Sequence, residues 1–285
     1  MDIDGTTRVV GVIGDPVSHS LSPAMHNAAF EALGLNWVYL AWHVAPEGVE
    51  QAVNAVRGLD LPGMNVTVPH KKAVIKFLDE LSPAAKAVGA VNTIVNRGGQ
   101  LYGDNTDVYG ILQAIRVGAK MDSVPPVVVV LGAGGAARGI VYALTTLPEV
   151  KSIRILNRTL ANAEELAREF GATSSVTAFG LEPHAARHAL DGCGLLINAT
   201  NLGRGKLANI SPLPDAWNCI PPRIVCIDSN YSPATTRLME QVVAAGGVAF
   251  NGLDMLVHQG ARAFELWTGM TPPVEVMRAA ANARL

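Results

Sequence analysis

The stretch Val127-Val-Val-Val-Leu131, followed directly by Gly132-Ala-Gly-Gly-Ala-Ala137, decides the fold of this chain. A run of five apolar residues, four of them β-branched, is typical of a buried strand in a parallel sheet. The residues after it match the pattern G-x-G-x-x-G/A, and a helical pattern follows over 136–147. The first glycine permits a tight turn, the second lets the backbone approach a pyrophosphate, and a small third residue lets the helix pack closely. The order of strand, glycine turn and helix predicts a Rossmann-type unit that binds a dinucleotide; a turn without a nucleotide is the alternative.

The end of the next strand indicates which dinucleotide is bound. The strand expected over 152–156 ends in Asn157-Arg158-Thr159, at the position where an Asp or Glu would hold the ribose 2′-hydroxyl of NAD. Arg158 either offers a planar cation to a 2′-phosphate or is a solvated loop arginine. The sequence therefore favours NADP, with NAD possible. The residues expected at the pyrophosphate, where a helix N-terminus offers free N–H groups, are Gly132, Ala133, Gly134, Gly135 and Ala136.

Strand and helix patterns alternate on both sides of the glycine turn. This βαβ order predicts an α/β fold with mainly parallel sheets and helices on both faces. Two domains are expected, and the stretch 120–126 resembles a linker. Strands are expected at 8–13, 37–43, 63–68, 127–131, 152–156, 195–199 and 224–228, with a hairpin over 90–96 and 100–104. Helices are expected at 23–33, 46–58, 71–81, 108–119, 136–147, 160–170, 255–266 and 274–284.

Composition narrows the class of protein. The 285 residues are 49% hydrophobic and 16% charged, with a net charge of −2, which gives no reason to expect nucleic acid or an anionic membrane as partner. The sequence contains no apolar run near the roughly 20 residues that span a bilayer, and the N-terminus lacks signal-peptide features. The three cysteines are odd in number and lack metal-ligand spacing. We expect reduced thiols, no metal site and a cytoplasmic location.

The first half of the chain holds candidate ligands for a small polar substrate. Ser20 and Ser22 lie where a strand has ended and a helix is expected to begin, with Pro23 at its first position. Ser22 suits the N-cap, so simple helix capping is one interpretation. The other is that both hydroxyls and the helix dipole bind a carboxylate.

Lys71 and Asp107 form a candidate acid–base pair. Lys71 follows an expected strand, at the sheet edge where open α/β folds bind ligands, and it opens an expected helix whose dipole does not favour a lysine. Asp107 lies just ahead of another helix, so capping is its alternative role. When hydride leaves an alcohol, one group must take the proton and another must hold charge and geometry. Thr67 and Asn92 could fix substrate hydroxyls.

At this point the chain resembles the shikimate dehydrogenase family over nearly its whole length. The segments that carry the resemblance are Ser20-Leu-Ser-Pro23, Asn65-Val-Thr-Val-Pro69, Lys71, Gly89-Ala-Val-Asn-Thr93, Asp104-Asn-Thr-Asp107, the glycine turn, Asn157-Arg-Thr159, Asn198-Ala-Thr200 and Gly252-Leu-Asp-Met-Leu-Val-His-Gln259. The resemblance implies a substrate-binding catalytic domain over 1–107, joined by C-terminal helices 255–285, and a Rossmann-type NADP-binding domain over 108–254. It also implies NADP-dependent interconversion of 3-dehydroshikimate and shikimate, on the way to chorismate and the aromatic amino acids.

The same resemblance implies roles for individual residues. Lys71 and Asp107 become the catalytic pair, and Ser20 and Ser22 hold the substrate carboxylate. The residues that reach the substrate hydroxyls are Thr67, Asn92, Asp107 and Gln259, with Tyr231 nearby. The cofactor contacts are the glycine turn, Asn157, Arg158 and Thr159 at the adenosine end, and Ser229 and Gly252 by the nicotinamide.

The chain departs from the family pattern at several positions. Asn162 stands where family members that use NADP often have a second cation. Asn201 ends the first nicotinamide-side loop in place of serine, and Ser229-Asn-Tyr-Ser-Pro233 replaces Met-x-Tyr-Asn-Pro. Val108-Tyr109 follows Asp107 where glycine is common. Two alternatives follow: a quinate/shikimate dehydrogenase using NAD or NADP, and a nucleotide-sensing relative without turnover. A monomer and a homodimer fit the composition equally.

Overall fold

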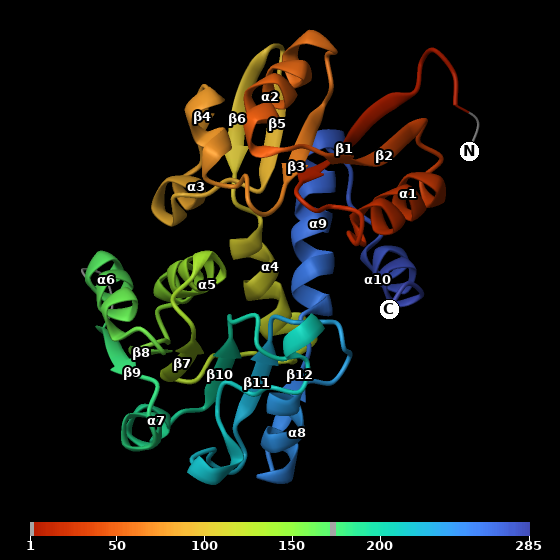
Figure 1. Ribbon diagram of the computed structural model, residues 1–285. Helices are drawn as coiled ribbons and strands as arrows, with labels where there is room; N and C mark the ends of the chain where they lie inside the picture. Colours follow the sequence, from red (N-terminus) through yellow and green to blue (C-terminus); the bar gives the residue numbers. More distant parts are fainter. Residues whose placement is uncertain (1–2, 172–174) are drawn as a thin grey trace. The chain divides into compact units, whose positions relative to one another are not determined.

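The computed structural model describes residues 3–171 and 175–285, and these divide into two compact units. The described residues up to Gly110, together with Leu256–Arg284, form the first unit. The second unit comprises Ile111–Met255 and Leu285. The division falls inside two helices, α4 (Asp107–Gln113) and α9 (Leu253–Thr268). Each unit has its own six-stranded sheet (Figure 1).

The sheet of the first unit has the strand order β2-β1-β3-β5-β6-β4. Five of its strands run in one direction and β5 runs against them, because β5 pairs antiparallel with both β3 and β6. The predicted hairpin is present: Arg97 pairs with Gln100, and Gly98 and Gly99 between them have φ of +63° and +92°. Two positive φ angles suit a two-residue turn that glycine adopts without strain. The strands are β1 (Arg8–Gly14), β2 (Trp37–His43), β3 (Gly63–Val66), β4 (Glu80–Leu81), β5 (Thr93–Arg97) and β6 (Gln100–Asp104).

Helices cover this sheet and bury its apolar side chains. Val53 and Val56 of α2 join Met64, Ile94 and Leu101 of the strands in one core cluster. The C-terminal helix α10 packs against α1 near the other end of the chain. The helices are α1 (Ser22–Ala32), α2 (Val49–Gly58), α3 (Pro83–Val88), most of α9 and α10 (Val274–Asn282), with short 3-10 turns at Pro46–Gly48 and Ala73–Phe77.

The sheet of the second unit confirms the Rossmann-type prediction. Its order is β12-β11-β10-β7-β8-β9, and all five pairings are parallel (Figure 1). The chain starts in the middle at β7, moves to one side, and then returns to fill the other side from β10. Ligands of such sheets bind at this switch point, beyond the carboxyl ends of the strands. The strands are β7 (Val127–Leu131), β8 (Ser152–Asn157), β9 (Ser175–Gly180), β10 (Leu195–Asn198), β11 (Val225–Asp228) and β12 (Val248–Phe250).

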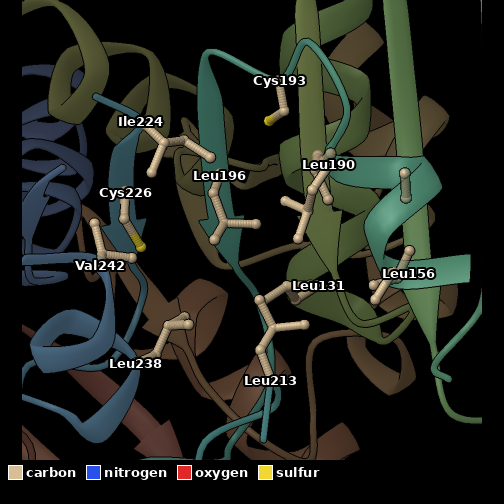
Figure 2. Packing of buried hydrophobic residues seen from close by; sticks show 13 residues of the cluster. Leu131, Leu156, Leu190, Cys193, Leu196, Leu213, Ile224, Cys226, Leu238 and Val242 are labelled. Atoms are coloured by element: carbon tan, nitrogen blue, oxygen red, sulfur yellow. The ribbon is translucent and has the colours of Figure 1, made fainter. Parts of the chain in front are cut away.

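Apolar side chains from strands and helices interlock beneath this switch point. Figure 2 shows Leu196 of β10 between Leu190 and Val242, and the same cluster includes Leu131 and Leu238. The three thiols are free; Cys193 and Cys226 are buried, and Cys219 is half-buried. The remaining helices are α4, α5 (Gly135–Thr145), α6 (Leu160–Phe170), α7 (Pro183–Leu190) and α8 (Arg237–Ala244), with 3-10 turns at Gly205–Leu207 and Asp215–Trp217.

One helix prediction was wrong in a way that affects the site. The helix expected over 71–81 is a 3-10 turn followed by β4, because Asp79 accepts a hydrogen bond from Leu101 N and draws the segment onto the sheet. Lys71 therefore lies in a turn and does not open a helix. The helix expected over 108–119 is confirmed: it begins at Asp107 and ends in a π-helical turn over Ala114–Gly118. Among the described residues, five short elements had no prediction: α3, β9, α7, α8 and β12.

Candidate active site

Lys71 and Asp107 form an ion pair at the carboxyl edge of the first sheet. Lys71 follows β3 through a turn, and Asp107 follows β6 as the first residue of α4. Lys71 Nζ donates to Asp107 Oδ2 over 2.7 Å. The two side chains are 28% and 24% exposed, so the pair is shielded but open to a ligand. A cation and a carboxylate in direct contact can hold and move a proton, as the predicted acid–base role requires.

Asn92 orients the carboxylate of this pair. Its Nδ2 lies 2.9 Å from Asp107 Oδ1, so both carboxylate oxygens have partners. The Asn92 side chain is itself held, because Thr106 N donates to Asn92 Oδ1 over 2.7 Å. Asn92 is buried, at 3% exposure. An amide fixed in this way restricts Asp107 to one rotamer facing Lys71.

Gln259 reaches the same group from the far end of the sequence. It lies on α9, and its Oε1 is 3.3 Å from Asn92 Nδ2 across 167 positions of the chain. Its Nε2 donates to Leu256 O over 2.7 Å. The structure thus brings together four predicted site residues through hydrogen bonds: Lys71, Asp107, Asn92 and Gln259.

The predicted carboxylate-binding serines lie at the start of α1. Ser22 was expected at the N-cap, but Leu21 occupies that position, and no side chain caps this helix end. The capping interpretation of Ser22 is therefore wrong, because its hydroxyl is one residue too far along the helix. Ser22 N donates to Ser20 Oγ over 3.3 Å, which joins the two serines. Among the described residues, no hydrogen bond joins them to Lys71 or Asp107.

Thr67 follows β3, and a close approach of backbone positions it. A Cβ at Gly14 would overlap the Cγ2 methyl of Thr67, so the glycine allows the two strand ends to lie side by side. Thr67 N donates to Ile13 O over 2.9 Å and is half-buried. Its side chain therefore sits at the same sheet edge as the turn that holds Lys71.

A buried polar network behind Asn92 was missed by the sequence analysis. Asn65 of β3 accepts from the Tyr39 hydroxyl at 2.8 Å and donates to Asn92 O and Thr93 Oγ1, both at 3.0 Å. Burial raises the pKa of Tyr39, and Ser22 hydrogen-bonds its hydroxyl. The only available signal was a polar residue inside an apolar strand, because buried amides need partners.

The glycine turn of the second unit leaves the start of α5 open. Gly132 has φ +102°, in the left-handed region that favours glycine, and an added Cβ would lie 3.0 Å from Thr200 Cγ2. Gly134 is at the N-cap and Gly135 begins the helix, and nothing lies within 4 Å of a Cβ built at either. Ala133 and Ala136 complete the turn. Because no side chain caps this helix end, its N–H groups are available to an anion.

A cavity of about 380 Å³ lies beside this turn, at the carboxyl ends of β7, β8 and β10. Asn157 and Arg158 form part of it, and Asn157 Nδ2 donates to Thr159 O over 2.8 Å to close the turn. Arg158 is exposed and pairs with no carboxylate of the described residues. The cavity is lined by Leu131, Gly132, Ala133, Gly134, Leu156, Asn157, Arg158, Leu181, Ala199, Thr200, Asn201, Leu202 and Pro212.

This arrangement fits a dinucleotide with a 2′-phosphate. The open glycine turn and the uncapped helix N-terminus suit a pyrophosphate, and the exposed guanidinium of Arg158 suits a phosphate dianion. Apolar side chains such as Leu156 and Leu181 suit a base. Thr159 contributes its backbone to the Asn157 turn.

Ser229, Tyr231 and Gly252 all belong to the second unit. Gly252 lies so close to the backbone of Ser229 that any Cβ would overlap it, and Ser229 N donates to Asn198 O over 2.9 Å. Ser229 and Gly252 do not line the cavity of the glycine turn. Tyr231 belongs to the second unit and Lys71 to the first. Burial raises the pKa of Tyr231.

The described residues contain no group of three or more His, Cys, Asp or Glu side chains arranged to hold a metal ion. Within the same part of the chain, no helix is both long and apolar enough to cross a membrane.

Fold and site together define a two-unit α/β protein with a Rossmann-type nucleotide site in one unit and a Lys–Asp pair in the other. Three family models match the chain: the shikimate dehydrogenase substrate binding domain over 12–94, shikimate/quinate 5-dehydrogenase over 120–201, and the shikimate 5′-dehydrogenase C-terminal domain over 252–281. The chain is 45% identical to the shikimate dehydrogenase (NADP(+)) of Symbiobacterium thermophilum, over 99% of this chain and 96% of that one. The chain belongs to the shikimate dehydrogenase family.

Solved structures agree with this assignment. Shikimate 5-dehydrogenase from Listeria monocytogenes, in complex with shikimate and NAD, has a TM-score of 0.92 at 37% identity and covers 98% of both chains. The enzyme from Thermus thermophilus, in complex with NADP(H) and shikimate, has a TM-score of 0.86 at 38% identity, over 98% of this chain and all of that one. The resemblance stated from the motifs is therefore confirmed.

Proposed function

We propose that this chain catalyses the NADP-dependent, reversible reduction of 3-dehydroshikimate to shikimate, in the route to chorismate and the aromatic amino acids. The observation that carries the proposal is the Lys71–Asp107 ion pair with Asn92 and Gln259 around it. Its family relatives are named for this activity, and two similar structures hold shikimate. Retention of both charged partners argues against a nucleotide sensor without turnover.

The first unit is proposed to bind the substrate. Ser20 and Ser22 would receive its carboxylate at the start of α1, where hydroxyls and the helix dipole favour an anion. Thr67, Asn92 and Gln259 offer hydroxyl and amide groups that match a ring bearing several hydroxyls. Tyr231 of the second unit is proposed as a further substrate contact.

Lys71 and Asp107 are proposed to manage the proton. In the reducing direction the Lys71 ammonium gives a proton to the substrate oxygen as the carbonyl carbon receives hydride. In the oxidising direction the lysine takes that proton back. Asp107 stabilises the charged lysine, and Asn92 keeps the carboxylate in place. Acid–base assistance of this kind contributes about 10²–10⁴-fold to rate.

The second unit is proposed to bind the cofactor. Gly132 to Ala136 would contact the pyrophosphate, Asn157 to Thr159 the adenosine end, and Ser229 and Gly252 the nicotinamide end. When bound, the nicotinamide supplies hydride to the substrate or accepts it. Arg158 favours NADP, but Asn162 provides no second cation for the 2′-phosphate.

The decisive experiment measures the absorbance of the reduced nicotinamide with purified protein. Shikimate and quinate are each tested with NADP⁺ and with NAD⁺. Reduction of NADP⁺ by shikimate, with little reaction of the other three pairs, is the expected result. Faster turnover of quinate would assign the chain to the quinate/shikimate alternative. Absence of turnover with all four pairs, in protein that binds NADP⁺, would support the sensor.

The cellular location and the oligomeric state are also proposals. Three free thiols are consistent with a cytoplasmic location. The assembly is proposed to be a monomer or a homodimer, which sedimentation distinguishes.

A further inference from the structure

Asn230 lies at the centre of a buried network in the second unit that the proposed chemistry does not use. It follows β11 and is 4% exposed. Its Nδ2 lies 2.9 Å from Asp228 Oδ1, 3.0 Å from Leu202 O and 3.2 Å from Thr200 O. One amide group therefore connects the end of β11 to two carbonyls of the loop after β10.

The anchor of this network is the buried carboxylate of Asp228. Besides the Asn230 side chain, Asp228 Oδ1 accepts from Asn198 Nδ2 and from Asn230 N, each over 3.0 Å. Asp228 Oδ2 accepts from Thr236 Oγ1 over 2.7 Å. Asp228 is fully buried, so these donors replace the water that a carboxylate would otherwise have. Both oxygens of the Asp228 carboxylate therefore have donors, and the carboxylate gives Asn230 a fixed position.

The loop that Asn230 holds is one wall of the nucleotide cavity. Ala199, Thr200, Asn201 and Leu202 all line it, and Thr200 Cγ2 also limits the space beside Gly132. A third segment joins at the same residue, because Gly252 N donates to Asn230 O over 2.9 Å. Asn230 thereby ties together the loop after β10, the end of β11 and the start of α9.

We propose that Asn230 is a positioning residue that holds the cavity wall 199–202 in the shape that NADP⁺ binds. This proposal rests on the proposed function for the cofactor site. Without the amide, the carbonyls of Thr200 and Leu202 each lose a donor. Leu202 O keeps a longer contact of 3.4 Å with Asn198 Nδ2, and Thr200 stays bonded to Asn198, so the loop becomes less ordered but is not released. Nucleotide binding would then include the cost of ordering the loop, which lowers affinity without removing any contact to the nucleotide.

The test compares binding of NADP⁺ to the whole protein, by titration calorimetry without substrate. N230L replaces the amide with an apolar side chain of similar size, and N230S keeps a small polar group that is too short to reach both carbonyls. We expect the dissociation constant for NADP⁺ to rise about tenfold in both, since a lost hydrogen bond corresponds to about a factor of ten.

A matched control removes the same kind of bridge from the first unit. Asn96 Nδ2 also donates to two backbone carbonyls, Leu61 O at 3.0 Å and Val56 O at 3.3 Å. N96L should lower the unfolding midpoint but leave the dissociation constant for NADP⁺ as in the wild type. Comparing the dissociation constant with the unfolding midpoint separates a positioning role of Asn230 from a general loss of stability.

Two outcomes would overturn the proposal: unchanged affinity for NADP⁺ in N230S, or an equal loss of affinity in N96L. If N230L does not fold, N230S alone decides. A wild-type protein that does not bind NADP⁺ would instead contradict the proposed function, so the two failures are distinguishable.

Discussion

At the scale of single residues, the site depends on polar side chains whose partners are fixed. Lys71 faces one oxygen of Asp107, and Asn92 holds the other. The carboxylate of Asp228 likewise has fixed partners, because four hydrogen bonds reach it. Burial nevertheless raises the pKa of Asp228. The orientation of each charged group is therefore decided by its neighbours, and single substitutions can test each one.

Lys71→Ala should lower the turnover of shikimate by about 10²–10⁴-fold, because the proton at the substrate oxygen loses its donor and acceptor. The binding of shikimate, measured by calorimetry, should change much less. Lys72→Ala is the matched control, since Lys72 is the exposed neighbour in the same turn, and it should keep wild-type turnover. A loss of only two- or threefold in the Lys71 variant would contradict the catalytic role.

His26→Phe should remove part of the acid sensitivity of folding. His26 is fully buried, its two ring nitrogens have no hydrogen-bond partner among the described residues, and it stacks on Tyr39 at 4.3 Å between ring centroids. Burial lowers the pKa of His26 from 6.5 to about 3. Between these values the unfolded chain binds a proton that the folded protein does not. The free energy of unfolding should therefore fall as pH decreases, by about 1 kcal/mol per pH unit.

The measurement is urea unfolding at several pH values between about 7 and 4.5. The phenylalanine variant keeps the ring stack and should show a shallower pH dependence over this range. Carboxyl groups with a lowered pKa, such as Asp79, act below the ordinary aspartate pKa of 3.8 and so outside this range. His184→Phe, which replaces an exposed histidine of α7, should retain the wild-type slope. Identical slopes in the wild type and the His26 variant would refute the explanation.

At the scale of elements, the turn between β7 and α5 shows why the position of a glycine matters more than its presence. Gly132 has a left-handed backbone and lies close to Thr200, whereas Gly139 lies inside α5 with nothing within 4 Å of an added Cβ. The two glycines belong to one strand–helix unit, so they can be compared directly.

Gly132→Ala should destabilise the protein by about 1–2 kcal/mol and weaken binding of NADP⁺, because L-residues disfavour this backbone region. Gly139→Ala should be neutral or stabilising by up to about 1 kcal/mol, since alanine is the better helix former. Urea unfolding and calorimetric binding of NADP⁺ measure both effects. Equal effects of the two substitutions would show that the turn does not need a glycine at Gly132.

At the scale of the whole molecule, each of the two units is proposed to bind one ligand. Each has its own sheet and its own core. A ligand that binds only the folded protein stabilises it by about 2.7 kcal/mol at a hundred times its dissociation constant. Hydrogen exchange can locate this stabilisation along the chain.

NADP⁺ alone should slow amide exchange mainly at the glycine turn and at Asn157 to Thr159. Shikimate alone should slow exchange mainly at the turn before Lys71 and around Asp107. Protection of the Lys71 turn by NADP⁺, without protection of the glycine turn, would contradict the assignment of the sites. Benzoate is the control ligand, because it keeps the carboxylate of shikimate but lacks the hydroxyls. It should not slow amide exchange at these positions.

Much of the second unit could be predicted because its signals are local. The strands at β7 and β8 and the helix α6 are continuous apolar or periodic runs, and the glycine turn has a fixed spacing. The shorter α7, α8 and β12 were missed because few residues carry each pattern. In the first unit, the segment after Lys71 was wrongly predicted as helical, since pairing of β4 with β6 depends on residues about twenty positions away.

The sequence by itself determined the α/β class, the Rossmann-type unit, the dinucleotide turn and the cation at Arg158, because these follow from periodicity and spacing within a few residues. The sequence also paired Lys71 with Asp107 as an acid–base candidate, and motif resemblance added Gln259 to the same site. Only the tertiary structure decided that Asn92 holds Asp107, that Leu21 and not Ser22 is the N-cap, and that Asn230 ties the cavity wall to Asp228. Those contacts join segments far apart in the chain, and packing, rather than local preference, selects them.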